Sequence, residues 1–250
     1  MKGRLLLLAL LMLGWMPAKA DHPAECRVAE NLLESSFRLP QVARALVKKR
    51  LTVLVVGAGS SQLPGSSGVA NAYPARLEHA LAQQLSGVQI KLTTDVKAKR
   101  TAAEMVKALP AALSAAKPEL LVWQTGTVDA MLAVDPDQFS QALDAGINIA
   151  HSAGADVVLI NAQYSPRTES MIALGTYAED MRWVALQHEI PLFDRFSIMK
   201  LWAGLGTFDL YSATKKLDMA EQVHDCIGIL LADLVVTAAK PEELPTNGSR

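Results

Sequence analysis

Few residues in this chain have the types and spacing that covalent chemistry needs. Ser60 and Ser61 follow an apolar run in a Gly/Ser-rich segment, and Glu221 and His224 are three residues apart, which places them on one face of a helix. A serine hydroxyl that is activated by a histidine, itself oriented by a carboxylate, is the arrangement of nucleophilic acyl transfer. The alternative is that both serines are ordinary turn residues and that His224 is a surface or capping residue.

The elements that must position these residues alternate along the chain. Short apolar runs are separated by longer amphipathic stretches, which is the pattern of a parallel sheet covered by helices on both faces. The predicted strands are Leu51–Val56, Val88–Thr93, Leu120–Gln124, Val157–Asn161 and Ile190–Phe193. The predicted helices are Tyr73–Leu85, Thr101–Ala115, Asp137–Ala153, Tyr177–His188 and Asp218–Ala239. One or two further helices are expected within Arg27–Arg50, interrupted or restarted at Pro40.

This order of elements predicts a three-layer α/β/α sandwich with a five-stranded parallel sheet of doubly wound, flavodoxin-like topology. In such sheets the ligand site lies beyond the carboxyl ends of the strands. We therefore expect any function to reside in the loops that follow the strands. These loops are Gly57–Ala72, Thr94–Arg100, Thr125–Val134, Ala162–Glu169 and Gly206–Lys216.

Both ends of the chain are expected to lie outside the folded domain. Lys2 and Arg4 precede a run of Leu, Ala and Met that ends in Ala18-Lys19-Ala20, so residues 1–20 are typical of a cleaved signal peptide. We therefore expect a periplasmic or secreted protein, with a retained N-terminal anchor as the alternative. Residues 21–240 form the predicted domain, and the polar tail 241–250 is expected to be disordered.

Composition limits the partners and indicates the redox compartment. Without residues 1–20 the chain has 21 basic and 25 acidic residues, a net charge of about −4 that gives no support for nucleic-acid binding. No later segment is long and apolar enough for a membrane span. Cys26 and Cys226 are predicted to form a disulfide, because exported proteins meet an oxidising compartment. Two separately buried thiols are the alternative.

Five segments, taken in order, carry motifs of a known enzyme family. They are Gly57-Ala58-Gly59-Ser60-Ser61, Tyr73-Pro74-Ala75-Arg76-Leu77-Glu78, Trp123-Gln124-Thr125-Gly126-Thr127-Val128-Asp129, Asn161-Ala162-Gln163-Tyr164-Ser165-Pro166-Arg167 and Leu217-Asp218-Met219. Together they resemble the SGNH/GDSL hydrolase superfamily over almost all of residues 26–235. The resemblance implies a serine esterase, in which a Ser attacks, a His activates it, an Asp orients the His, and N–H groups together with an Asn side chain hold the oxyanion.

The nucleophile and the base depart from the pattern of that family. An ungapped alignment from Tyr73 places Gly59 at the nucleophile, whereas a shift of two residues places Ser61 there. In the closing segment, Lys215 takes the place of the Asp and Asp218 takes that of the His. A carboxylate with an ordinary pKa near ~3.9 is a much weaker base at neutral pH than imidazole.

The groups that hold the oxyanion depart from the pattern as well. The family has a glycine with an inward N–H after its second strand, but the corresponding stretch Val96-Lys97-Ala98-Lys99-Arg100 has none, so that only Ala98 could offer this N–H. In the third motif, Trp123–Asp129, Val128 replaces the asparagine. The loss of one oxyanion donor typically costs about 10²–10³ in rate. We therefore expect a vestigial pocket. Its predicted members are Gly59, Ser60, Ala98, Gly126, Val128, Asp129 and Asp218.

These departures predict an exported, catalytically inactive protein that acts as a binding or accessory factor in the cell envelope. The alternative is a weak serine esterase that uses Ser61 with His224 and Glu221, and a purely structural envelope protein is a third reading. Five cations in two strand-end loops are expected to hold an anionic small molecule or glycan, unless they form an ordinary solvated rim. These cations are Lys97, Lys99, Arg100, Lys215 and Lys216. Without metal-ligand spacing or a dinucleotide-binding glycine motif, no metal or cofactor is expected.

Overall fold

The structure is a computed structural model that describes residues 22–212 and 217–240. The predicted signal peptide, the predicted disordered tail and the candidate cations Lys215 and Lys216 lie outside these ranges. Among the helices within them, none combines the length and the apolar character that a membrane crossing requires.

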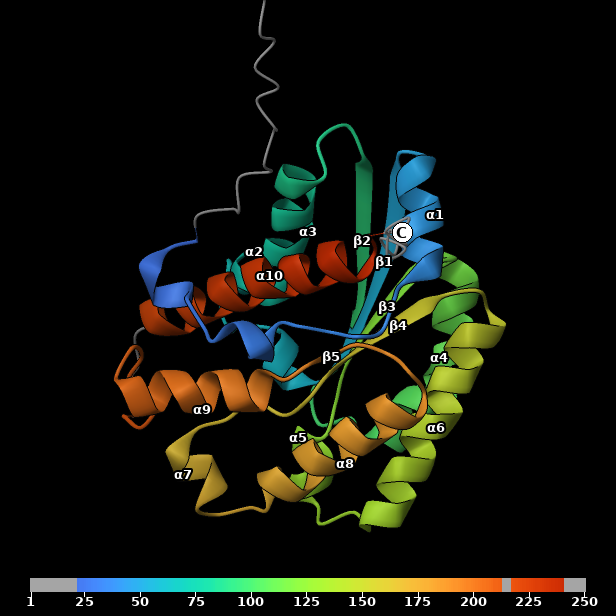
Figure 1. The fold of residues 1–250 in the computed structure, drawn as a ribbon. Helices are drawn as coiled ribbons and strands as arrows, with labels where there is room; N and C mark the ends of the chain where they lie inside the picture. Colours follow the sequence, from blue (N-terminus) through green and yellow to red (C-terminus); the bar gives the residue numbers. More distant parts are fainter. Residues whose placement is uncertain (1–21, 213–216, 241–250) are drawn as a thin grey trace, which may run out of the picture.

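Five parallel strands form one sheet in the order β2-β1-β3-β4-β5 (Figure 1). The prediction of a five-stranded parallel sheet is therefore confirmed. In this order the direction of winding reverses between β1 and β3, and a crevice is expected at that point beyond the carboxyl ends of the strands. The strands are β1 (Arg50–Gly57), β2 (Gln89–Val96), β3 (Leu120–Gln124), β4 (Asp156–Ile160) and β5 (Leu192–Phe193).

Helices cover both faces of this sheet (Figure 1). On one face, α3 (Tyr73–Gln84) packs against α10 (Asp218–Ala238). They approach closely at Gly228, where an added Cβ would lie 2.4 Å from the Cβ of Arg76. A row of three helices covers the other face: α4 (Ala102–Ala116), α6 (Pro136–Ser152) and α8 (Leu174–Gln187).

Shorter elements complete the described part of the chain. The helix α1 begins at Pro40, as the sequence predicts, because proline suits the first helical turn. The other short helices are α2 (Gly68–Asn71), α5 (Thr127–Met131) and α7 (Pro166–Glu169). The bounds of α1 are Pro40–Val47. Three 3₁₀ turns are also present: η1 (Ala24–Cys26), η2 (Glu30–Leu32) and η3 (Gly59–Ser61).

The helix α9 (Arg195–Leu205) has no counterpart among the predicted helices, and neither have the short helices α2, α5 and α7. Helix α9 begins directly after β5, and Asp194 caps it by accepting a hydrogen bond from the Ser197 N–H at 3.0 Å. Asn161, at the end of β4, fixes the same turn. Its side-chain amide donates to Asp194 at 2.7 Å, and its side-chain oxygen accepts from the Phe196 N–H at 2.8 Å.

A disulfide joins the two ends of the domain and confirms the predicted pairing. Cys26 in η1 is bonded to Cys226 in α10, which lies 200 residues further along the chain. Both cysteines are buried. The bond holds the described segment before α1, which contains the two short 3₁₀ turns η1 and η2, against the last helix.

Candidate functional site

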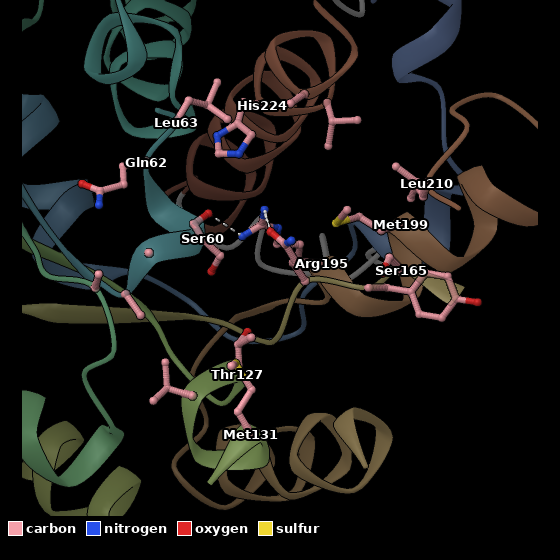
Figure 2. Close-up of a pocket in the computed structure, with 18 of the residues that line it drawn as sticks. Ser60, Gln62, Leu63, Thr127, Met131, Ser165, Arg195, Met199, Leu210 and His224 are labelled. Carbon is pink, nitrogen blue, oxygen red and sulfur yellow. Dashed lines mark hydrogen bonds between the residues drawn. The ribbon is translucent and has the colours of Figure 1, made fainter. Parts of the chain in front are cut away.

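A pocket of about 780 Å³ lies beyond the carboxyl ends of the strands. The loops after β1, β2, β3 and β4 line it together with α9 and the start of α10. In Figure 2, Ser60, His224 and Arg195 are grouped on one side of the pocket, and Met199 and Leu210 lie toward the other. The site therefore lies where the predicted topology requires it.

Ser61, the alternative nucleophile, is not part of this pocket. Its side chain is buried, and its Oγ donates a hydrogen bond to the Gln124 side-chain oxygen at 2.9 Å. Because that bond uses the Ser61 proton, the Tyr73 hydroxyl must be the donor in the second contact of Ser61, also at 2.9 Å. The same Gln124 oxygen accepts the Ala58 N–H at 3.2 Å. Ser61 thus closes a structural network behind η3 and does not face a substrate.

His224 lines the pocket but has the wrong tautomer for a general base. The Tyr73 N–H donates to Nδ1 of His224 at 2.9 Å, and because a peptide N–H can only donate, the imidazole proton must be on Nε2. Burial, with a smaller contribution from the positive charge of Arg195, lowers the pKa of His224 to about 3. The ring is therefore neutral near pH 7 and presents a donor to the pocket. A serine proton has no acceptor on it.

Glu221 does not orient His224. Its carboxylate accepts a hydrogen bond from the Asn71 side-chain amide at 2.8 Å, and the oxygen of Asn71 in turn accepts from Arg76 at 2.8 Å. Glu221 therefore ties α10 to the segment around α2 and α3. The arrangement of Ser61, His224 and Glu221 that the sequence offers as an alternative is not assembled in the structure.

The vestigial nucleophile position does lie at the pocket. Gly59 and Ser60 both line it, and the Oγ of Ser60 has no hydrogen-bond partner within the described ranges. A Cβ added to Gly59 would meet nothing closer than Ala98, whose Cβ would be 3.8 Å away in ordinary contact. Crowding therefore does not explain why a serine is missing at this position.

The third motif keeps its buried aspartate, Asp129, but has Val128 at the position of the oxyanion-binding asparagine. Val128 lines the pocket from α5, where it adds an apolar wall. Asp129 points into the protein instead, accepting from the Ala102 N–H at 2.9 Å and from the Thr125 hydroxyl at 3.3 Å. Burial raises the pKa of Asp129, and these hydrogen bonds oppose the shift. Gly126 caps α5 with a φ of 92°, a left-handed conformation that favours glycine.

The position of the family histidine lies away from the pocket. Asp218 is the first residue of α10, it is exposed, and it is not among the residues that line the cavity. A carboxylate at a helix N-terminus is stabilised by the helix dipole. Lys215, at the position of the family Asp, lies outside the described residues.

The predicted cationic rim is reduced to one lysine in the described part of the chain. Arg100 is buried and forms an ion pair with Asp95 at 2.8 Å, so it supports the end of β2. Lys97 is exposed, lies 3.8 Å from the same carboxylate and does not line the pocket. Lys99 does line it. The prediction that Lys97 and Arg100 face a ligand is therefore wrong.

The dominant charge in the pocket is Arg195, which the sequence reading did not single out. It is the first residue of α9, and only 1% of it is exposed. Its guanidinium donates to the Ser60 carbonyl at 3.0 Å and to the Gln163 side-chain oxygen at 3.1 Å, and it lies 5.8 Å from the ring centre of Tyr73. Burial lowers the pKa of Arg195 to about 10, with Tyr73 acting in the opposite direction. The one sequence signal for it is a cation placed directly after a predicted strand.

Comparison with known proteins places the chain in a family. Residues 25–241 match the non-GDSL lipase-like family, so the chain belongs to that family. No curated protein sequence matches it.

Solved structures with the same fold are SGNH/GDSL hydrolases of low sequence identity. TesA is 22% identical with a TM-score of 0.56, and the match covers 73% of this chain and 99% of TesA. The lipase/acylhydrolase from Enterococcus faecalis is 18% identical with a TM-score of 0.59, covering 78% and 100%. The esterase EstA from Pseudoalteromonas is 17% identical with a TM-score of 0.57, covering 74% and 97%. The chain therefore shares the fold of these proteins.

Proposed function

We propose that this protein is an exported SGNH-hydrolase-like binding protein without esterase turnover. The observation that carries the proposal is the hydrogen bond from the Tyr73 N–H to Nδ1 of His224, because it leaves no imidazole nitrogen free to accept a proton among the described lining residues. A serine is a weak nucleophile until an adjacent base accepts its proton. Ser60 lines the pocket, but its buried hydroxyl has no hydrogen-bond partner, and therefore no base, within the described ranges.

The groups that would stabilise a transition state are also replaced. Val128 offers no hydrogen bond from the position of the oxyanion amide, and Asp218 lies outside the pocket. Triad residues act as a unit, so the loss of the base alone forfeits most of the rate acceleration. What persists is a partly open pocket of about 780 Å³, a size typical of small-molecule sites.

Hydrolysis of p-nitrophenyl acetate and labelling by a serine-reactive fluorophosphonate test this proposal. We expect the mature chain to show neither above a buffer blank, under conditions in which an active SGNH esterase shows both. Ser60→Ala and Ser61→Ala are the matched variants. Turnover or labelling that Ser60→Ala abolishes would show an active nucleophile and overturn the proposal.

Export is supported by two independent features. The segment 1–20 has the composition of a signal peptide, and the Cys26–Cys226 disulfide suits an oxidising compartment. Fractionation of cells that express the full chain, followed by mass measurement, tests export. We expect a mature form that lacks residues 1–20 outside the cytoplasm, with both cysteines protected from alkylation. An uncleaved, cytoplasmic and fully alkylated chain would contradict this part of the proposal.

A further inference from the structure

Arg195 is a buried cation without a carboxylate partner in the described part of the chain. Its two hydrogen-bond acceptors, the Ser60 carbonyl and the Gln163 side chain, are both neutral. A charge that is 99% removed from solvent is costly unless an opposite charge pairs with it. Tyr73, the nearest acidic group by its influence on the pKa of Arg195, itself has its pKa raised to about 12, mainly by burial. Arg195 is therefore uncompensated in this structure.

The guanidinium retains free hydrogen-bonding capacity toward the pocket. The side chain carries five N–H groups, and the two acceptors occupy one on each terminal nitrogen. Nε is buried and has no partner among the described residues. The planar fork of an arginine matches a carboxylate, which can accept two of its N–H groups at once. The unsatisfied donors therefore indicate the charge and the kind of group that is missing.

The groups beside Arg195 reinforce this preference for an acceptor. His224, which lines the pocket, presents Nε2–H beside the guanidinium, whereas the unpartnered Ser60 hydroxyl is buried. The one carboxylate among the described lining residues, Asp209, is exposed and accepts from the N–H groups of Tyr211 and Ser212 in its own turn. This side of the pocket thus offers donors to a ligand, and no described carboxylate competes for Arg195.

Aliphatic side chains form most of the remaining lining of the pocket, which also includes the polar side chains of Gln62, Lys99, Thr127 and Ser165. Its walls carry flexible and branched aliphatic side chains, and methionines can adapt to chains of different shape. A polar ligand such as a glycan would leave its hydroxyl groups unpaired against these walls. The aliphatic wall includes Leu63, Val128, Met131, Met199, Leu210 and Val223.

We infer that the pocket binds an aliphatic monocarboxylate, with the carboxylate on Arg195 and the chain along the wall formed by Val128, Met131 and Met199. This inference rests on the proposed function, because a ligand that is held and not cleaved needs a non-catalytic pocket. Arg195 is the one buried cation among the described lining residues, since Lys99 is exposed, and a single buried cation pairs with a single negative charge, which favours a carboxylate over a phosphate dianion. In this inference Arg195, and not the predicted set of five cations, binds the anion.

Calorimetric titration of the mature chain with sodium decanoate tests the inference directly. We expect saturable one-site binding of decanoate and binding at least about tenfold weaker for decanol, which has the same chain without the charge. Decyl phosphate distinguishes the two anionic head groups. If decanol binds as tightly as decanoate, or if decyl phosphate binds more tightly, the inferred carboxylate site is wrong.

Two variants locate the site. Arg195→Met keeps a long side chain, removes the charge, and should weaken decanoate binding about tenfold or more while decanol binding changes little. Should this variant fail to fold, Met131→Glu serves instead, because Met131 is 62% exposed and a new negative charge there should repel decanoate more than decanol. Lys97→Ala is the matched control, since Lys97 does not line the pocket. Undiminished decanoate binding by Arg195→Met, or by Met131→Glu in its place, would overturn the inference.

The outcome is separable from that of the proposed function. Absence of decanoate binding together with absence of ester turnover would contradict only the inferred ligand class. Turnover that depends on Ser60 would contradict the proposed function, whether or not decanoate binds.

Discussion

The backbone N–H of Tyr73 donates to Nδ1 of His224 at 2.9 Å, and this bond sets the chemistry of the pocket. In a catalytic serine hydrolase the histidine donates from Nδ1 to a carboxylate and accepts the serine proton at Nε2. Here the roles of the two nitrogens are reversed, because the first residue of α3 supplies a donor where the family would have an acceptor. His224, which is not at the position of the family histidine, thus lies in the pocket as a hydrogen-bond donor.

The reversed tautomer predicts an imidazole that does not titrate near neutral pH. Nitrogen-15 NMR of the folded protein should show protonated Nε2 and unprotonated Nδ1 for His224 throughout about pH 5–8. The pKa of the unfolded residue is near ~6.5, whereas that of the folded residue is about 3. The unfolded chain therefore holds more protons between these values, and His224 makes the free energy of unfolding fall as pH falls through them.

His224→Asn tests the linkage, because asparagine can accept the Tyr73 N–H through its side-chain oxygen without titrating. We expect the variant to lose part of the pH dependence of the free energy of unfolding between about pH 3 and 6.5, by up to ~5 kcal/mol. Urea unfolding at several pH values measures this. An unchanged dependence, or a His224 resonance that titrates near pH 6.5, would contradict the assignment.

Substitutions of Ser61 and Ser60 should differ in their effect on the stability of the protein, and neither should change ester turnover. Ser61→Ala removes a bond to Gln124 and leaves the buried Tyr73 hydroxyl without its acceptor, so we expect a loss of about 1–3 kcal/mol. Ser60→Ala removes a hydroxyl that has no partner among the described residues and should change stability by less than about 0.5 kcal/mol. Thermal and urea unfolding of both variants measure the difference. Equal losses would mean that the network behind η3 does not hold as described.

The sheet was predictable because buried parallel strands consist of continuous runs of apolar residues. Leu120–Gln124 is predicted and observed with the same bounds, and every residue of β3 and β4 is buried. The last helix ends within one residue of its prediction, at Ala238. Capping and amphipathic patterns involve residues that are close in sequence, so they can be recognised in a single sequence.

The site was less predictable because its roles depend on distant partners. The residues that orient Ser61 lie 12 and 63 positions away, and the donor to His224 lies 151 positions away. No local pattern contains such a relation. Arg195 was missed for a related reason: its helix follows a strand of only two residues, and its burial depends on the loops around Ser60 and Gln163.

Two glycines of the first motif should respond differently to a side chain. An added Cβ at Gly57 would lie 2.2 Å from the Ser61 Oγ, so Gly57→Ala should destabilise the protein by about 1–3 kcal/mol. Gly59 has room for a side chain, so Gly59→Ser should be within about 1 kcal/mol of the parent. Chemical denaturation compares the two.

The same Gly59→Ser variant also bears on catalysis. It restores a hydroxyl at the ungapped nucleophile position, yet His224 still lacks an acceptor nitrogen for its proton. We therefore expect no turnover of p-nitrophenyl acetate and no fluorophosphonate labelling. Labelling of this variant would show that a missing nucleophile, and not the missing base, is what silences the pocket.

Reduction of the Cys26–Cys226 bond should destabilise the whole domain. The bond closes a loop of 200 residues, and the chain-entropy model gives a contribution on the order of 4–5 kcal/mol for a loop of this size. Urea unfolding with and without reductant measures the loss. Cys26→Ala with Cys226→Ala is the control for the reductant itself, and its stability should match that of the reduced parent.

Asp156, which binds the start of α1, should make the stability of the protein depend on pH. Its carboxylate accepts the N–H groups of Gln41 and Val42 at 2.7 and 2.9 Å, more than a hundred residues away in sequence. Burial raises the pKa of Asp156 to about 6, against an ordinary value of 3.8, and the two N–H bonds only partly oppose this. Folding therefore favours the protonated form, and the contribution of Asp156 to stability falls as pH rises from about 4 to about 6.

Asp156→Asn keeps an acceptor oxygen for both N–H groups but carries no charge, so its effect should depend on pH. Relative to the parent we expect it to gain stability between about pH 4 and pH 7, by ~1–3 kcal/mol. Asp156→Ala is the matched variant that removes the acceptor, and it should cost about 1–3 kcal/mol through the unpaired N–H groups at the start of α1. Urea unfolding across this pH range measures both. If Asp156→Asn tracked the parent at every pH, the carboxyl would titrate alike in the folded and unfolded chains, and burial at the start of β4 would not control its charge.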